Sequence, residues 1–198
     1  MPLWNLAVAF SRFQASLNIV NDVELTEQML TVAFGRRFGE DFTLNIVGGG
    51  ILGGDLTDSV SGEHEVSQGV IGSVQGTQRL VRQRGARPFV LGTLSFSASR
   101  TTTTPMAGGS SSSLVATDFR VSAMAGYRLR KRFTVHSAAR AFAGPVFWSN
   151  VDDPGSDRHF FQLAVGGSVF LPGKTRLFTE WAFLGERNIT VGVARSFR

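Results

Sequence analysis

The chain has 198 residues, of which 42% are hydrophobic and only 18% are charged, and its formal net charge is +5. This balance excludes intrinsic disorder, and the absence of cysteine excludes a disulfide framework, a thiolate metal site and a cysteine nucleophile. A transmembrane helix needs about 20 consecutive apolar residues, and the sequence contains no such run. Met1 to Phe10 lacks the basic start of a signal peptide. We therefore expect one mature domain that covers residues 1–198.

Apolar and polar residues alternate from one end of the chain to the other, and this period of two is typical of β-strands. Only Thr26 to Phe34 also fits a short helix, and its alternation fits a strand equally well. The chain is therefore predicted to be all-β. Turn signals divide it into ten predicted strands, at residues 2–17, 26–38, 41–53, 64–83, 87–100, 113–129, 132–149, 158–171, 174–185 and 188–197.

The connections between the predicted strands alternate in length. Tight turns are predicted at residues 39–40, 84–86, 130–131 and 172–173. Longer polar loops are predicted at residues 18–25, 54–63, 101–112 and 150–157. The short turn at Glu186 and Arg187 is the one exception to the alternation. Short turns at one rim, long loops at the other and an even strand number indicate an up-and-down antiparallel β-barrel.

The direction in which the apolar face points indicates whether such a barrel is surrounded by lipid or by water. The opposite face of each strand carries small and polar residues, and Lys is absent from the middle of the strands. A soluble barrel needs a charged exterior, whereas a membrane barrel carries its apolar side chains outside. We therefore predict a transmembrane β-barrel whose first partner is membrane lipid. The alternative is a soluble lipocalin-like carrier, in which the apolar residues would line a pocket for an apolar ligand.

Charge is distributed unequally between the two predicted rims. Of the 20 basic residues, 13 fall near the short turns, among them Arg82, Arg128, Lys131 and Arg176. Of the 15 acidic residues, 11 fall on the long-loop side. The basic residues form a ring at strand ends and not a patch interleaved with aromatic residues, so a nucleic-acid partner is not expected. A basic rim suits contact with anionic lipid headgroups.

The last two predicted strands carry a further pattern. Leu177 to Phe183 contains Glu180 beside aromatic residues, and Asn188 to Phe197 ends with Gly-Val-Ala-Arg-Ser-Phe. Both stretches resemble the closing strands of opacity-like and OmpX-like bacterial outer-membrane β-barrels. The resemblance implies a bacterial outer-membrane location and a usual strand number of eight, which is our alternative to ten. Arg198 departs from the pattern, because the aromatic residue is the last one in that group.

If the apolar residues face lipid, several charged residues must point into the lumen. Buried charges must be paired, so our first interpretation is a set of ion pairs that plugs and braces the barrel. The alternative is a cation-rich constriction that selects small anions in a passive pore. The residues predicted to form this lumen site are Arg79, Asp118, Arg120, His136, Arg140 and Glu180.

Gly48, Gly50 and Gly53 spell G-x-G-x-x-G after a predicted strand, which is the spacing of a dinucleotide-binding loop. That site requires a helix that starts at the loop. Residues 54–62 have no apolar face at helical spacing. We therefore expect the end of a strand here and no bound cofactor.

Two pairs of residues resemble parts of outer-membrane enzymes. Asp157 and His159 have the spacing of the Asp-x-His pair of omptin proteases, but the acidic pair expected on the opposite wall is missing. His136 with Ser137 resembles part of the His/Ser/Glu set of lipid A deacylases, but neighbouring residues of a strand point in opposite directions. The histidines are scattered, which argues against a metal site. We therefore expect no catalysis and no metal.

The sequence as a whole predicts a monomeric outer-membrane β-barrel with a narrow polar lumen and a structural or surface-interaction role. Its long acidic loops would face outside, and its basic turns would face the periplasm. A small passive pore for anionic solutes is the alternative function.

Overall fold

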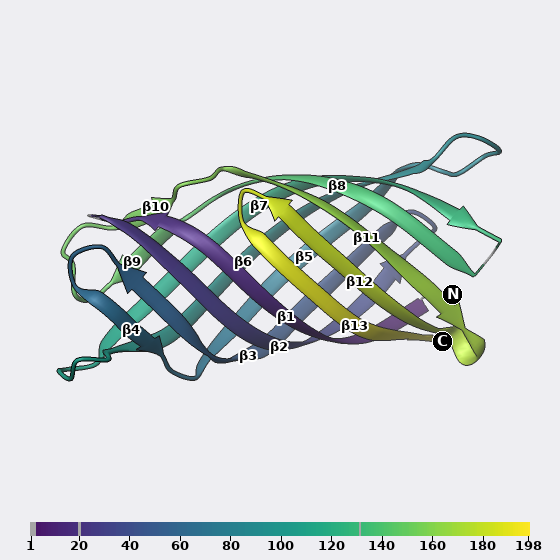
Figure 1. Cartoon of the computed structure of the whole chain (residues 1–198). Coiled ribbons are helices and arrows are strands. Elements are labelled where there is room, and N and C mark those ends of the chain that lie inside the picture. The colour runs from purple at the N-terminus through teal and green to yellow at the C-terminus, as the bar shows by residue number, and fades with distance from the viewer. Residues whose placement is uncertain (1–2, 20, 131) are drawn as a thin grey trace.

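The computed structural model describes residues 3–19, 21–130 and 132–198. Pro2 in the first predicted strand, Val20 in the first predicted loop and Lys131 in the basic rim lie outside the described residues. In the part of the chain that is described, thirteen antiparallel β-strands and one 3-10 turn form a single closed sheet (Figure 1). None of its helical segments is long and apolar enough to cross a membrane. The prediction of an all-β, up-and-down barrel is confirmed.

The strands follow one another around the barrel with short connections. In chain order they are β1 (Leu3–Asn18), β2 (Asp22–Phe38), β3 (Phe42–Asp58), β4 (Gly62–Val66), β5 (Gly69–Val81), β6 (Phe89–Pro105), β7 (Ser112–Leu129), β8 (Phe133–Ala143), β9 (Pro145–Trp148), β10 (Gly155–Asp157), β11 (Phe161–Leu171), β12 (Thr175–Leu184) and β13 (Arg187–Phe197). The 3-10 turn η1 (Pro172–Lys174) joins β11 to β12.

The strand number exceeds the predicted ten because three walls of the barrel are each divided into two segments. β4 and β5 both pair with β3 and β6, with a break at residues 67–68. β8 and β9 both pair with β7 and are separated by Gly144, where any Cβ would collide with the backbone of β7. β10 occupies part of the predicted loop 150–157 and continues, after a break, as β11.

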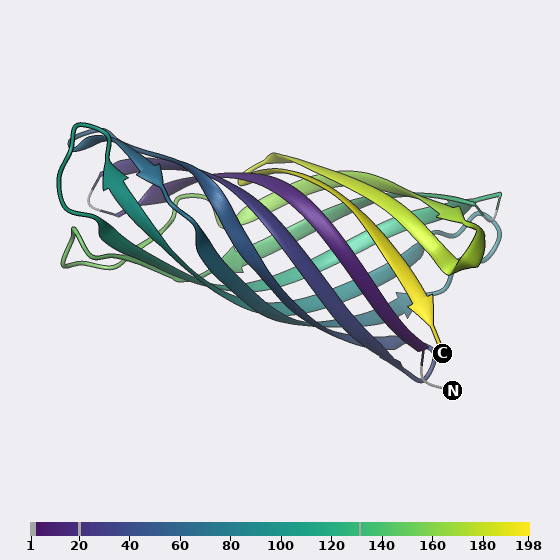
Figure 2. The same cartoon turned by 90° about the horizontal axis from the view of Figure 1, so that it is seen from below.

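The barrel narrows along its axis. β1 pairs with β13 from Trp4 to Gln14 and then with β10 at Leu17 and Asn18, because β12 and β13 end part of the way along the barrel. Figure 2 shows β1 beside β13 where the sheet closes. The wide ring, at the short-turn end, contains the ten strands β1, β2, β3, β5, β6, β7, β8, β11, β12 and β13. The narrow ring, at the opposite end, contains the eight strands β1, β2, β3, β4, β6, β7, β9 and β10.

The apolar face of the sheet changes sides between the two rings. In the wide ring, Leu30 and Val32 of β2 point outward and are exposed, as predicted for a lipid-facing belt. Nearer the narrow end of the same strand, Val23 and Leu25 point inward and are buried, while Glu24 between them is exposed. The expectation of an outward apolar face is therefore wrong for the narrow end. Apolar side chains turn inward there, as they do in a barrel surrounded by water.

The long loops are shorter than predicted, because the strands continue past the apolar belt. β1 ends at Asn18 and β2 begins at Asp22, so most of the predicted loop 18–25 is strand. β3 likewise reaches Asp58. Turn signals ended the predicted strands, whereas Asp22, Glu24 and Asp55 continue β2 and β3 as exposed residues of the outer face.

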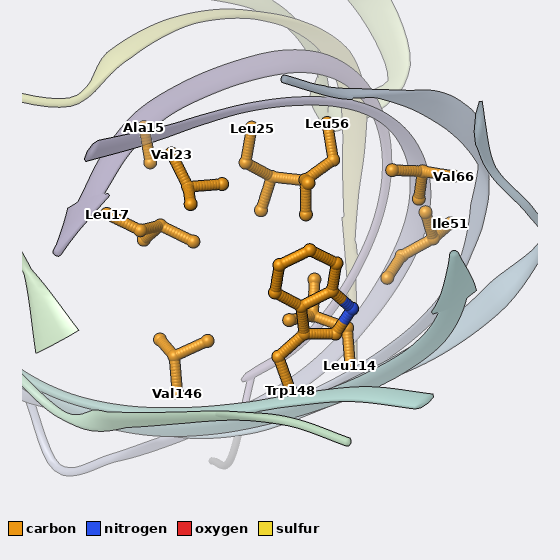
Figure 3. Packing of buried hydrophobic residues seen from close by; sticks show 10 residues of the cluster. All are labelled: Ala15, Leu17, Val23, Leu25, Ile51, Leu56, Val66, Leu114, Val146 and Trp148. Carbon is orange, nitrogen blue, oxygen red and sulfur yellow. The ribbon is translucent and has the colours of Figure 1, made fainter. Parts of the chain in front are cut away.

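A cluster of buried apolar side chains fills the narrow ring, and we call it the apolar plug (Figure 3). Trp148 lies in it with 3% of its surface exposed, and its Nε1 donates a hydrogen bond to Thr103 Oγ1 at 2.9 Å. A ring of about eight strands is only wide enough for side chains to fill. The narrow ring also buries polar side chains, among them His64 of β4 and Thr103 of β6, so it is not purely apolar. The plug contains Ala15, Leu17, Val23, Leu25, Ile51, Leu56, Val66, Leu114, Val146 and Trp148.

Candidate functional site

Charged and polar side chains from the three neighbouring strands β8, β11 and β12 meet inside the wide ring. Arg140 on β8 approaches Glu180 on β12, and its Nη2 lies 2.7 Å from each carboxylate oxygen. The Nη1 of Arg140 donates to Gln162 Oε1 on β11 at 2.7 Å. His136 Nε2 lies 3.3 Å from Glu180 Oε2. The inward guanidinium is therefore matched by one carboxylate and one amide oxygen.

A second ion-pair group adjoins the first one. Arg120 Nη2 lies 2.9 Å from Glu186 Oε2 and 3.0 Å from Asp118 Oδ2, and the guanidinium stacks at 4.6 Å over the Phe142 ring. Gln162 joins the two groups, because its Nε2 donates to the Glu186 carbonyl at 3.0 Å. We call the connected set the lumen network. It consists of Asp118, Arg120, His136, Arg140, Gln162, Glu180 and Glu186.

The lumen network contains five of the six residues predicted for the lumen. Arg79 is the exception: it lies nearer the short turns, where it pairs with Asp41 at 3.6 Å. The prediction missed Gln162, which looks like any polar position of a strand, and Glu186, which was assigned to the long-loop rim. Glu186 belongs to the early turn between β12 and β13, and only 3% of its surface is exposed. The one signal for it was the short turn that broke the alternation of loop lengths.

A polar cavity of about 350 Å³ lies between the lumen network and the apolar plug. Its lining includes four carboxylates, from Glu27, Asp118, Asp157 and Glu186, but only one guanidinium, from Arg120. Among the described residues, Asp118 Oδ1 and Asp157 Oδ1 are buried without a hydrogen-bond partner. Acidic groups therefore outnumber basic groups around this cavity.

A second cavity, of about 820 Å³, lies on the short-turn side of the lumen network, and we call it the vestibule. It extends from the turn residues Arg82 to Gly85 to His136 and Glu180 of the network. Its wall combines arginines, apolar side chains and neutral polar side chains such as Thr134, Ser168 and Thr190. The arginines that line it are Arg79, Arg82, Arg128 and Arg176. The apolar side chains that line it are Phe89, Leu91, Met124, Phe170 and Phe178.

The chemical motifs seen in the sequence do not assemble into the sites that they resemble. The glycine run 48–53 lies within β3, so the expected end of a strand there is wrong, and no helix follows it in the described part of the chain. His159 is exposed outside the strands, whereas Asp157 lines the polar cavity. His136 belongs to the lumen network, while its neighbour Ser137 is exposed on the opposite face. The described residues contain no group of His, Cys, Asp or Glu suited to a metal ion.

Solved structures share this architecture. The β-domain of the Bordetella autotransporter BrkA matches with a TM-score of 0.58 at 12% identity, over 98% of each chain. An outer-membrane channel from Pseudomonas putida F1 matches with a TM-score of 0.55 at 11% identity, over 100% of this chain and 96% of that one. The translocator domain of the autotransporter NalP from Neisseria meningitidis matches with a TM-score of 0.54 at 13% identity, over 99% of this chain and 88% of that one.

These likenesses define the class of the fold: the chain has the fold of outer-membrane β-barrels. No known protein family matches the sequence, and no curated protein matches it. The resemblance to the opacity-like and OmpX-like group stays a prediction.

Proposed function

We propose that the protein is a monomeric integral β-barrel of a bacterial outer membrane. In this proposal its lumen is closed, and its role is structural or directed at surface partners, without catalysis. The basic short-turn rim faces the periplasm, and the narrow acidic end projects outside. The fold shared with outer-membrane barrels and the exposed apolar belt of the wide ring support this placement.

The apolar plug is the observation that carries the closed lumen. Leu114 and Trp148 reach the middle of the narrow ring, where Leu56 approaches from the opposite wall (Figure 3). An ion that crosses the barrel would have to leave water for a ring of packed apolar side chains. Transfer of an unpaired ion into such surroundings costs several kcal/mol or more. The lumen network, deeper in the barrel, opposes passage a second time.

Single-channel recording in a planar bilayer tests this proposal. The native protein is expected to produce no stepwise current. Trp148→Ala removes the largest side chain of the plug and is expected to admit measurable current. Phe147→Ala is the matched control, because Phe147 precedes Trp148 on β9 but points outward. Steady current steps from the native protein would refute the closed lumen.

A small passive pore for anions is the second candidate function, and the basic vestibule favours it. This hypothesis predicts native current steps that are selective for anions. It also predicts that Arg120→Ala or Arg140→Ala changes the conductance, since both guanidiniums lie in the lumen. The closed barrel predicts silence from the native protein, so one recording separates the two functions.

A further inference from the structure

We propose that the vestibule is a binding site for a small amphipathic anion, an organic carboxylate or phosphate attached to an apolar body. The site opens at the short-turn end and lies outside the lumen network, so it does not require an open lumen. It therefore goes beyond the proposed function. The binding experiment below and the conductance experiment above can fail independently.

Two of the four arginines in the vestibule have no carboxylate partner. Arg79 and Arg82 both pair with Asp41, at 3.6 and 2.9 Å. Arg128 and Arg176 make no ion pair within the described ranges of the chain. The acid on the floor of the vestibule, Glu180, does not supply one, because Arg140 and His136 already occupy its oxygens. The vestibule therefore carries two guanidiniums whose charge no side chain balances.

These two guanidiniums are held in place by aromatic rings. Arg128 Cζ lies 4.5 Å from the centre of the Phe170 ring, and Arg176 Cζ lies 5.5 Å from the centre of the Phe178 ring. Gln83, from the turn between β5 and β6, exchanges two hydrogen bonds with the backbone of Arg128, at 2.8 and 3.1 Å. A guanidinium that lies over an aromatic ring uses none of its N–H groups in a hydrogen bond to that ring, and the fork geometry of these groups fits carboxylate and phosphate oxygens.

Glycines on the neighbouring strands keep the cavity open. The Phe89 ring lies against Gly126, and the Phe178 ring lies against Gly192. A Cβ at either glycine would collide with the ring, so the absence of a side chain there lets each ring lie close against the wall. Leu91 and Met124 extend the apolar surface between them. These apolar side chains face the cavity. A ligand that covers them gains about 25 cal/mol for each Å² of apolar surface that it removes from water.

Two guanidiniums without a carboxylate partner and an apolar wall together define the class of ligand. An inorganic anion would satisfy Arg128 and Arg176 but leave the aromatic wall in water. A neutral apolar molecule would cover the wall but leave the guanidiniums without an anion. An amphipathic anion does both, and the volume of about 820 Å³ lies within the usual range of small-molecule sites.

Calorimetric titration of the protein in phosphatidylcholine nanodiscs tests the proposal, with empty nanodiscs as the blank. The probes are 2-naphthoate, its neutral counterpart 2-naphthalenemethanol, and inorganic phosphate. We expect saturable binding of 2-naphthoate, and binding of the other two weaker by about tenfold or more, since charge-assisted hydrogen bonds contribute about 1.5–3 kcal/mol. Equal binding of the neutral probe, or equal binding of phosphate, would overturn the amphipathic class.

Matched variants locate the site. Arg128→Gln with Arg176→Gln is expected to weaken 2-naphthoate binding by about tenfold or more. Arg195→Gln is the control, because Arg195 is exposed on β13 near the same rim but does not line the vestibule. The migration of unheated samples in a detergent gel verifies that each variant forms a barrel. Arg176→Gln alone replaces the double variant should that one fail to fold. No saturable binding by the native protein, or undiminished binding by the variant, would refute the site.

Discussion

Glu27 is a buried carboxylate without a partner. It points inward from β2 into the polar cavity, 6% of its surface is exposed, and no described residue forms a hydrogen bond or ion pair with its side chain. Burial of an unpaired charge is costly. Glu27→Gln removes the charge at almost the same volume and is expected to raise the free energy of unfolding by about 1 kcal/mol or more.

The measurement is the temperature at which half of the protein loses the migration of the unheated sample in a detergent gel. A change of about 1 kcal/mol corresponds to about 2–4 °C in this thermal midpoint for a chain of this length. Glu24→Gln is the control, since Glu24 is exposed on the same strand. A lower midpoint for Glu27→Gln than for the native protein would show that an unseen partner stabilises the carboxylate.

Arg120 has the opposite role, because two acids depend on it. Its guanidinium contacts Asp118 and Glu186, and it is the only cation that lines the polar cavity in the described chain. Arg120→Leu leaves both carboxylates buried and unpaired, and removal of one partner of a buried ion pair typically costs about 3–5 kcal/mol. We expect a loss of that size in thermal or urea unfolding. Adding Glu186→Gln to Arg120→Leu should recover part of the lost free energy of unfolding. The exposed Arg100→Leu is the control, and a loss for Arg120→Leu no greater than that of the control would contradict the prediction.

At the scale of strands, alternation alone located almost every wall of the barrel. The predicted segments 41–53 and 174–185 correspond to β3 and β12 within a few residues at most ends. What alternation could not show was the change of solvent along a strand. Period two is the same whether the apolar face meets lipid or the lumen, so the inward Val23 and Leu25 gave no signal of the plug. The early end of β12 and β13, which places Glu186 inside, depends on pairing between distant strands.

The short-turn rim contains an ion pair that joins separate hairpins. Asp41, in the turn between β2 and β3, accepts a hydrogen bond from Arg82 beyond the end of β5, at 2.9 Å. This bond, with the nearby charges of Arg82, Arg79 and Arg37, holds the pKa of Asp41 below its ordinary value of 3.8. A carboxyl whose pKa is lower in the folded state stabilises that state above the ordinary pKa. The contribution is lost as the pH falls through the lowered value.

We therefore expect Asp41→Asn to lower the thermal midpoint at pH 7, and the difference from the native protein to shrink as the pH falls below 3.8. The difference is measured from the thermal midpoints of both proteins, heated in non-ionic detergent across a pH series and then run on a gel. Asp152→Asn, in an exposed loop, serves as the reference. A difference that is constant with pH would mean that the ionised form of Asp41 does not stabilise the rim.

At the scale of the whole molecule, the taper of the barrel divides the lumen into zones of different chemistry. The wide ring leaves room for the vestibule and the lumen network, and the narrow ring leaves room only for packed side chains. The outer surface also changes character along the barrel axis. An apolar exterior surrounds the wide ring, where lipid is expected, and a mixed exterior that includes Glu24, Asp55 and Glu65 surrounds the plug.

Maleimide labelling can map this boundary, because the chain contains no cysteine of its own. Ile46 and Thr57 both point outward from β3 and are exposed, and 61% of the surface of Ile46 is accessible. If the wide ring is embedded in lipid, a water-soluble maleimide should modify Thr57→Cys rapidly in lipid vesicles and leave Ile46→Cys unmodified. In urea without lipid, both cysteines should react, which controls for intrinsic reactivity. Rapid labelling of Ile46→Cys in the folded protein would mean that the belt meets water, and the soluble carrier hypothesis would then have to explain a barrel whose apolar side chains face outward.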